Sequence, residues 1–221
     1  MECLMIPLFP ALAALIWWAV KPFVVAAGWR RLAGDLHLAY RPGRGFLGLP
    51  NPGQIEGTYR GREVEIRLVV ETVPHADGSY RRRFMKMTLG LRTTSPRRLV
   101  VQRGWHPELP KHGEGVELPD RLFAERYAVT VSDPADLAVK VFHDEGQRQR
   151  FHASIGARGR FSLNLEGRTL ELSTRSSGWF LPDRGIEWRT GVLKAILDAL
   201  VEVVEAAEQA PIAPWRLLDQ G

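Results

Sequence analysis

The sequence predicts an α+β fold in which an N-terminal transmembrane helix precedes an antiparallel, hairpin-rich sheet domain with two helices, the longer at the C-terminus. Three patterns indicate this architecture: an apolar run at the N-terminus, segments of alternating apolar and polar residues, and a long amphipathic segment near the C-terminus. We expect four parts: an anchor over residues 1–29, a Gly/Pro-rich juxtamembrane linker over 30–53, the α+β domain over 54–210 and a tail over 211–221.

The N-terminal run predicts a membrane-spanning helix. Residues 3–29 hold one charged side chain, Lys21, and a helix that crosses the hydrocarbon core needs about 20 mostly apolar residues. In the favoured register residues 3–20 span the core, and in the alternative register a tilted helix reaches Trp29. The side chains expected at the headgroups are amphipathic rings and basic groups, namely Trp17, Trp18, Lys21, Trp29, Arg30 and Arg31.

The charge around the run predicts its orientation. No basic residue precedes it, whereas Arg30, Arg31, Arg41 and Arg44 follow within the window of about 15–20 residues that sets topology. We therefore expect a single-pass protein of a bacterial inner (cytoplasmic) membrane, with its N-terminus outside and its C-terminal domain in the cytoplasm. Two alternatives fit less well. A signal peptide cleaved after Ala27 would lack its basic n-region, and a buried hairpin of a soluble fold would have to hide an unusually long run.

The composition narrows the possible chemistry of the domain. Lys and Arg number 30 and Asp and Glu 25, so the net charge is +5, which mildly favours an anionic membrane surface. The single cysteine, Cys3, lies in the apolar run. This placement excludes a disulfide framework, a thiolate metal site and thiol catalysis in the domain.

Alternating segments predict antiparallel hairpins. Segments 54–60 and 62–73 flank a turn at Arg60-Gly61, and the run FSLNLEGRTLELS turns at Glu166-Gly167. Further strands are expected over 84–92 and 97–103. The side chains of the second hairpin that should face the core are Leu163, Leu165, Leu170 and Leu172.

Two helices are expected in the domain. Ser132-Asp133-Pro134 is typical of a helix start, and the helix that follows should end near Glu145. A longer helix should run from Thr190 to about Gln209, because charged and apolar residues separate onto opposite faces at helical spacing.

Two short motifs are candidates for ligand binding. Gly43, Gly45 and Gly48 match the G-x-G-x-x-G string, but Pro50 and Pro52 follow at once and cannot open the helix that a dinucleotide site needs. The cluster Arg81, Arg82 and Arg83 is a possible contact for an anion or a partner protein. Strand alternation would divide these three arginines between two faces, so solvated arginines that pair with glutamates of the next strand are the favoured interpretation.

No pattern predicts catalysis. The spacing of His106 and His112, and of His143 and His152, matches no metal-ligand motif. The chain has no Gly-x-Ser-x-Gly elbow, and no pair of carboxylates stands out. We expect a protein that is not an enzyme, with no catalytic residues, no metal and no cofactor.

Three segments carry a family resemblance: IEGTYRGREVEI, VELPDRLFAERYAVTVSDPADLAVKVF and FSLNLEGRTLEL. Together they resemble membrane-anchored bacterial domains of unknown function, over about residues 54–173. The resemblance implies a bacterial, membrane-associated and non-catalytic protein, and it carries no site residues.

These patterns lead to ranked functional hypotheses. The first is a single-pass, membrane-anchored accessory or assembly subunit of a bacterial membrane protein complex, with the lipid bilayer and other membrane protein subunits as partners. Nucleic acid is an unlikely partner. The alternative is a membrane-tethered module that binds an anionic ligand or lipid headgroup through Arg81 to Arg83. An enzyme with a site assembled from scattered residues comes third.

Overall fold

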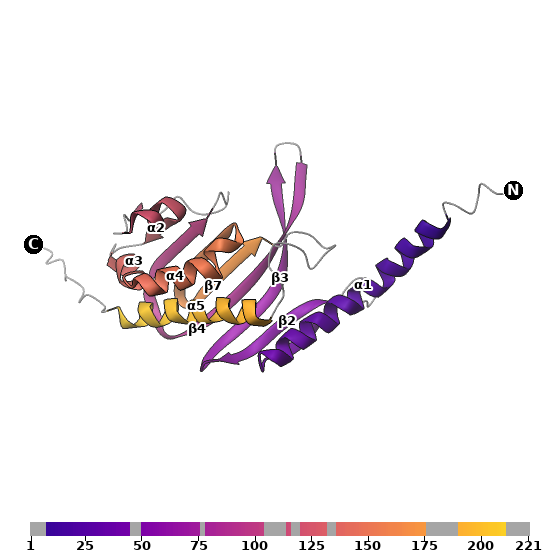
Figure 1. Cartoon of the computed structure of the whole chain (residues 1–221), viewed down its shortest axis with the longest axis horizontal. Helices are drawn as coiled ribbons and strands as arrows, with labels where there is room; N and C mark the ends of the chain where they lie inside the picture. Colours follow the sequence, from indigo (N-terminus) through magenta and orange to yellow (C-terminus); the bar gives the residue numbers. More distant parts are fainter. Residues whose placement is uncertain are drawn as a thin grey trace, which may run out of the picture. The chain divides into compact units, whose positions relative to one another are not determined.

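The computed structural model describes residues 8–44, 50–75, 78–103, 114–115, 120–131, 136–175 and 190–210 (Figure 1). The chain forms two compact units. The first consists of residues 1–88 with 175–194, and the second of residues 89–174 with 195–221.

The described elements confirm an α+β fold with an antiparallel sheet. The helices are α1 (Leu8–Asp35), α2 (Arg121–Arg126), α3 (Asp136–Val141), α4 (Glu145–Ser154) and α5 (Thr190–Gln209), with a 3-10 helix, η2 (Gly156–Arg158). The strands are β1 (Ala39–Arg44), β2 (Pro50–Tyr59), β3 (Arg62–His75), β4 (Gly78–Arg103), β5 (Glu114–Gly115), β6 (Ala128–Val131) and β7 (Phe161–Arg175). Hydrogen bonds connect them in the order β1-β2-β3-β4-β6-β5, and β7 pairs with β4.

The predicted turn between β2 and β3 is confirmed. Tyr59 pairs with Arg62 across the hairpin. Arg60 and Gly61 have φ angles of 50° and 74°, which is the left-handed conformation that a two-residue turn of this hand requires.

In the first unit, the C-terminal half of α1 packs on β1 and β2. Apolar residues at helical spacing supply the helix side of this core, namely Ala26, Trp29, Leu32, Ala33 and Leu36, all of them buried. They lie in one core with Ile55 of β2 and Ile66 of β3. The segment predicted as a linker, 30–53, therefore contains the end of α1, all of β1 and the start of β2.

The prediction of a transmembrane anchor is wrong. Within the described residues, the structure contains no helix that is long and apolar enough to cross a membrane. Trp29, expected at the headgroups, is 5% exposed in the core of the first unit. The predicted location depends on this anchor, so the prediction of a single-pass protein with its N-terminus outside an inner membrane is wrong as well.

In the second unit, aromatic side chains from helices and strands pack against one another. Phe151 of α4 contacts Phe142 and Phe161 with ring centroids 5.4 and 5.8 Å apart. Phe123 of α2 lies 5.0 Å from Phe142. The leucines of β7 that were predicted to face the core are all fully buried, namely Leu163, Leu165, Leu170 and Leu172, and Gly167 between them has a φ of 59°.

The prediction of two helices in the domain is wrong in number. The structure shows α5 with the predicted bounds and ends the other predicted helix early, as α3, at Val141. It also shows two helices that were not predicted: α2, and α4, which begins at Glu145 where the predicted helix was to end. Between α3 and α4 lies Asp144, whose extended backbone (φ −78°, ψ 125°) interrupts the helical path and whose side chain caps α4. Its side chain accepts a hydrogen bond from the Gln147 N–H at 2.6 Å.

Candidate functional site

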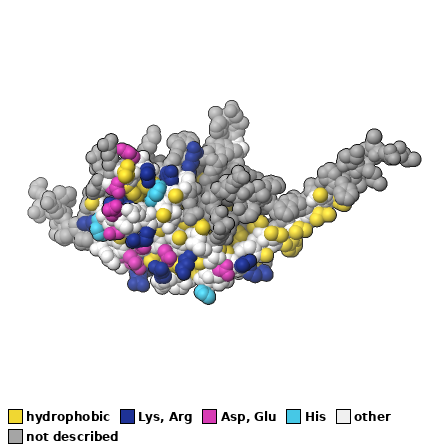
Figure 2. Space-filling model, in the orientation of Figure 1, with side chains coloured by type: hydrophobic (Ala, Val, Ile, Leu, Met, Phe, Trp, Pro, Cys, Tyr) yellow, Lys and Arg dark blue, Asp and Glu magenta, His cyan; other side chains and the backbone are white. Residues whose placement is uncertain are grey.

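The first candidate surface is an apolar stripe on α1, made of Leu12, Ile16, Val20, Phe23 and Val24. These five side chains are between 45% and 58% exposed. Their spacing of three and four residues puts them on one face, opposite the face that Trp29 and Leu32 bury. Figure 2 shows hydrophobic side chains gathered along this helix. An apolar face of this length on a solvent-facing helix is typical of an interaction surface.

The residues predicted at a membrane interface do not form one site. Trp17, Trp18 and Lys21 belong to α1, and their side chains lie outside the described residues. Arg30 lies over the ring of Tyr40 in β1, 5.9 Å from its centroid, and Arg31 is exposed. The remaining residue, Trp29, belongs to the core.

The predicted anion contact is on β4. Arg81, Arg82 and Arg83 belong to this strand, and their side chains are outside the part of the chain that the structure describes. Their role as an anion or partner contact therefore stays a prediction.

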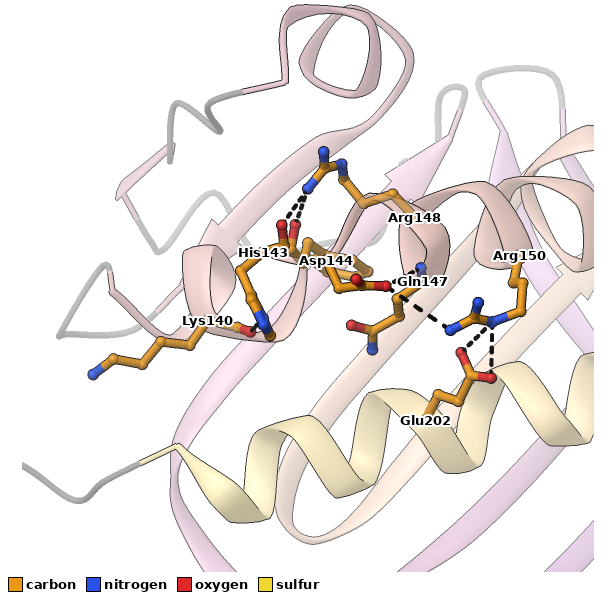
Figure 3. Close-up of polar contacts among 8 residues, drawn as sticks. Lys140, His143, Asp144, Gln147, Arg148, Arg150 and Glu202 are labelled. Atoms are coloured by element: carbon orange, nitrogen blue, oxygen red, sulfur yellow. Dashed lines mark hydrogen bonds and ion pairs between the residues drawn. The ribbon is translucent and has the colours of Figure 1, made fainter.

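In the second unit, Arg148 of α4 makes hydrogen bonds with the segment after α3 (Figure 3) and with the N-cap residue of α2. Its guanidinium donates hydrogen bonds to the carbonyl oxygens of Phe142 at 2.6 Å and His143 at 2.8 Å. Its Nε also donates to the carboxylate of Asp120 at 2.9 Å. Asp120 caps α2 by accepting from the Phe123 N–H, and this bond, together with Arg148, lowers the pKa of the Asp120 carboxyl below 3.8.

A second arginine connects α4 with α5. Arg150 donates through Nε to both carboxylate oxygens of Glu202 at 3.0 Å, and its Nη2 lies 3.9 Å from Asp144 (Figure 3). The carboxylates of Glu202 and Asp144 therefore balance the charge of the Arg150 guanidinium. Together with Asp120, the polar residues in Figure 3 therefore connect α2, α4, α5 and the end of α3.

The second candidate site is a basic corner formed by Arg103, Arg126, Tyr127 and His152. Arg103 is the last residue of β4, Arg126 ends α2, Tyr127 follows it, and His152 lies on α4. The Tyr127 hydroxyl contacts Nδ1 of His152, and Nη1 of Arg126 lies 3.3 Å from Nε2 of the same ring. Nη1 of Arg103 is shielded from solvent and has no hydrogen-bond partner among the described residues.

The electrostatics of the corner follow from its two arginines and from burial. Desolvation lowers the pKa of His152 below 6.5, and the charges of Arg126 and Arg103 lower it further. Desolvation also raises the pKa of Tyr127 above 10.0, against the opposing effect of the same two arginines. Both arginines therefore act on both rings, and His152 favours its neutral form.

Sequence reasoning did not find the basic corner. Its members come from three elements and span positions 103 to 152, so no short motif contains them. The signal in the sequence was the abundance of arginine, which does not say which arginines the fold places beside carboxylates. No group of residues suited to a metal ion occurs among those described.

No protein-family model matches the chain, and no curated protein matches it. Its fold is similar to that in the crystal structure of the mycobacterial trehalose monomycolate transport factor A, TtfA, with a TM-score of 0.56 and 11% sequence identity. The match covers 86% of this chain and 98% of that chain. At this identity the likeness shows a shared fold and nothing about activity.

Proposed function

We propose that the chain is a non-catalytic accessory subunit that attaches to a membrane protein through the apolar stripe of α1, in an assembly that transports lipids. The stripe carries the proposal. It presents Leu12, Ile16, Val20, Phe23 and Val24 on one exposed face of α1, in the part of the helix that precedes the residues buried in the first unit. A fully buried side chain of this kind contributes about 1.5–3 kcal/mol, so a partner that covers the stripe gains substantially.

The arrangement favours a protein groove as the partner surface. A helix with anchors at spacings of three and four residues fits the helix-in-groove mode of recognition. The lipid-transport setting is supported by the likeness of the fold to a trehalose monomycolate transport factor.

Mild detergent extraction of the tagged full-length chain, followed by mass spectrometry, tests the proposal. We expect an integral membrane protein to remain bound in a fixed ratio. The triple substitution Ile16→Gln, Val20→Gln and Phe23→Gln should abolish its recovery, because it places polar groups across the docking face.

The matched control is Val70→Gln, which changes an exposed apolar residue (49% exposed) on β3 in the same unit. It should leave recovery of the partner unchanged. Recovery of the chain alone, or of the same partner with the triple variant, would contradict the proposal. Flotation with protein-free vesicles, lost in the triple variant, would show that lipid itself is the partner of the stripe.

A further inference from the structure

We propose that the basic corner of the second unit binds a phosphate group. The proposal does not depend on the α1 stripe, which belongs to the first unit. It rests on two arginines that have no acidic partner among the described residues, on a shielded guanidinium nitrogen that finds no acceptor there, and on a tyrosine hydroxyl whose proton is available.

The first argument is the pattern of charge pairing in the second unit. Arg148 pairs with Asp120, Arg150 with Glu202, and Arg98 lies 3.6 Å from Glu166. Within the described residues, Arg103 and Arg126 make no such contact with a carboxylate. A shielded donor without an acceptor is costly, and a bound anion would remove this cost at Nη1 of Arg103.

The second argument follows from the hydrogen bonds of His152. Arg126 can only donate, so Nε2 of His152 must accept from it. A neutral ring then carries its proton on Nδ1, which donates to the Tyr127 oxygen. The tyrosine O–H proton is left to donate elsewhere, which adds a neutral donor to the two guanidinium groups.

The third argument is Gly156, whose missing side chain leaves room for the Tyr127 hydroxyl. A Cβ placed on Gly156 would overlap the Tyr127 hydroxyl and lie 2.9 Å from Nδ1 of His152. Only glycine at this position therefore lets the two side chains meet as they do. The lowered pKa of His152 agrees with this geometry, because burial of the ring lowers it first and the charges of Arg126 and Arg103 lower it further.

The donor set fits a tetrahedral oxyanion. Phosphate offers at least three acceptor oxygens and up to two negative charges, which suit two guanidinium groups and a hydroxyl, whereas a carboxylate offers two oxygens. The phosphate group could belong to free phosphate or to a phospholipid whose headgroup is a phosphomonoester. The chemistry at the corner is the same for both sources.

Calorimetric titration of the full-length chain at low ionic strength tests the inference with two probes, inorganic phosphate and dihexanoyl phosphatidic acid below its micellar concentration. We expect saturable binding of at least one probe. Arg126→Gln and Arg103→Met should each weaken it by about tenfold or more, since each removes a charge-assisted hydrogen bond. Arg103→Lys, which keeps the charge and loses the planar fork, should weaken it less.

The control is Arg160→Gln, an exposed arginine of the same unit outside the corner. It should leave the affinity unchanged. Binding of both probes would show that the phosphate group suffices, and binding of the lipid probe alone would identify a phospholipid as the source. Absence of binding, or equal loss in Arg126→Gln and Arg160→Gln, would overturn the inference. Arg126 is exposed, so its variant tests the site even if Arg103→Met fails to fold.

Discussion

At the scale of single residues, Gly156 decides whether the basic corner can form. Gly156→Ala should lower the free energy of unfolding by about 1–3 kcal/mol, because the new methyl group would overlap the Tyr127 hydroxyl and its Cζ atom. Gly28→Ala is the matched control. It lies in α1, and apart from its chain neighbours and the backbone of its own helix no atom lies within 4 Å of its Cβ position, so it should raise the free energy of unfolding by about 0.5–1 kcal/mol. Urea titration of both variants measures these changes, and equal effects would contradict the role of Gly156.

The titration of His152 gives the second residue-scale prediction. Its pKa is lower in the folded chain than the ordinary value of 6.5, chiefly through desolvation and then through Arg126 and Arg103. The Tyr127 hydroxyl also faces the ring. The folded chain therefore binds fewer protons than the unfolded chain as the pH falls through 6.5, and this contribution to stability, present above 6.5, is lost on acidification.

Thermal unfolding at about pH 7.5 and about pH 5.5 checks this sign. His152→Gln should show a smaller drop in melting temperature between the two conditions than the unaltered chain. The size of the effect is limited by solvent, since the ring is only partly buried. Equal drops in both proteins would show that His152 does not couple protonation to folding.

At the scale of elements, a helix could be predicted from the sequence where charged residues mark one of its faces. The bounds of α5 were predicted because charged residues mark the solvent side. In α1 residues 8–29 carry one charged side chain, Lys21, so the residue pattern does not show that Trp29 is buried while Ile16 and Phe23 are exposed. The strand β1, which packs on α1, was not predicted, because its segment is rich in Gly and Pro.

The division between α3 and α4 leads to the element-scale prediction. Asp144→Ala removes the acceptor for the Gln147 N–H and should lower stability by about 1 kcal/mol. Asp144→Asn is the control, because an amide oxygen still accepts this bond, and it should cost only a few tenths of a kcal/mol. Denaturant unfolding distinguishes the two. If both variants were equally destabilised, the 3.9 Å contact between Asp144 and Arg150 would matter more than the cap.

At the scale of the whole molecule, the candidate surfaces were harder to predict than the fold. Antiparallel pairing, the Arg60-Gly61 turn and the inward leucines of β7 all follow from local alternation of side chains. The basic corner and the buried face of α1 depend on contacts between distant segments, which no local pattern encodes. The sequence does not distinguish the arginines of the basic corner from arginines that pair with carboxylates, because the pairing depends on which residues the fold brings close.

The apolar stripe gives the last prediction, which concerns how the whole chain behaves in solution. Without a partner, exposed Leu12, Ile16 and Phe23 should drive the purified chain to self-associate as its concentration rises, because contact between copies removes apolar surface from water. Ile16→Gln, Val20→Gln and Phe23→Gln together should give a monomer by analytical ultracentrifugation. The melting temperature should stay the same, because the substituted side chains are exposed and precede the buried part of α1. A variant that still self-associates, or that melts earlier, would show that these side chains belong to the core and do not form a docking surface.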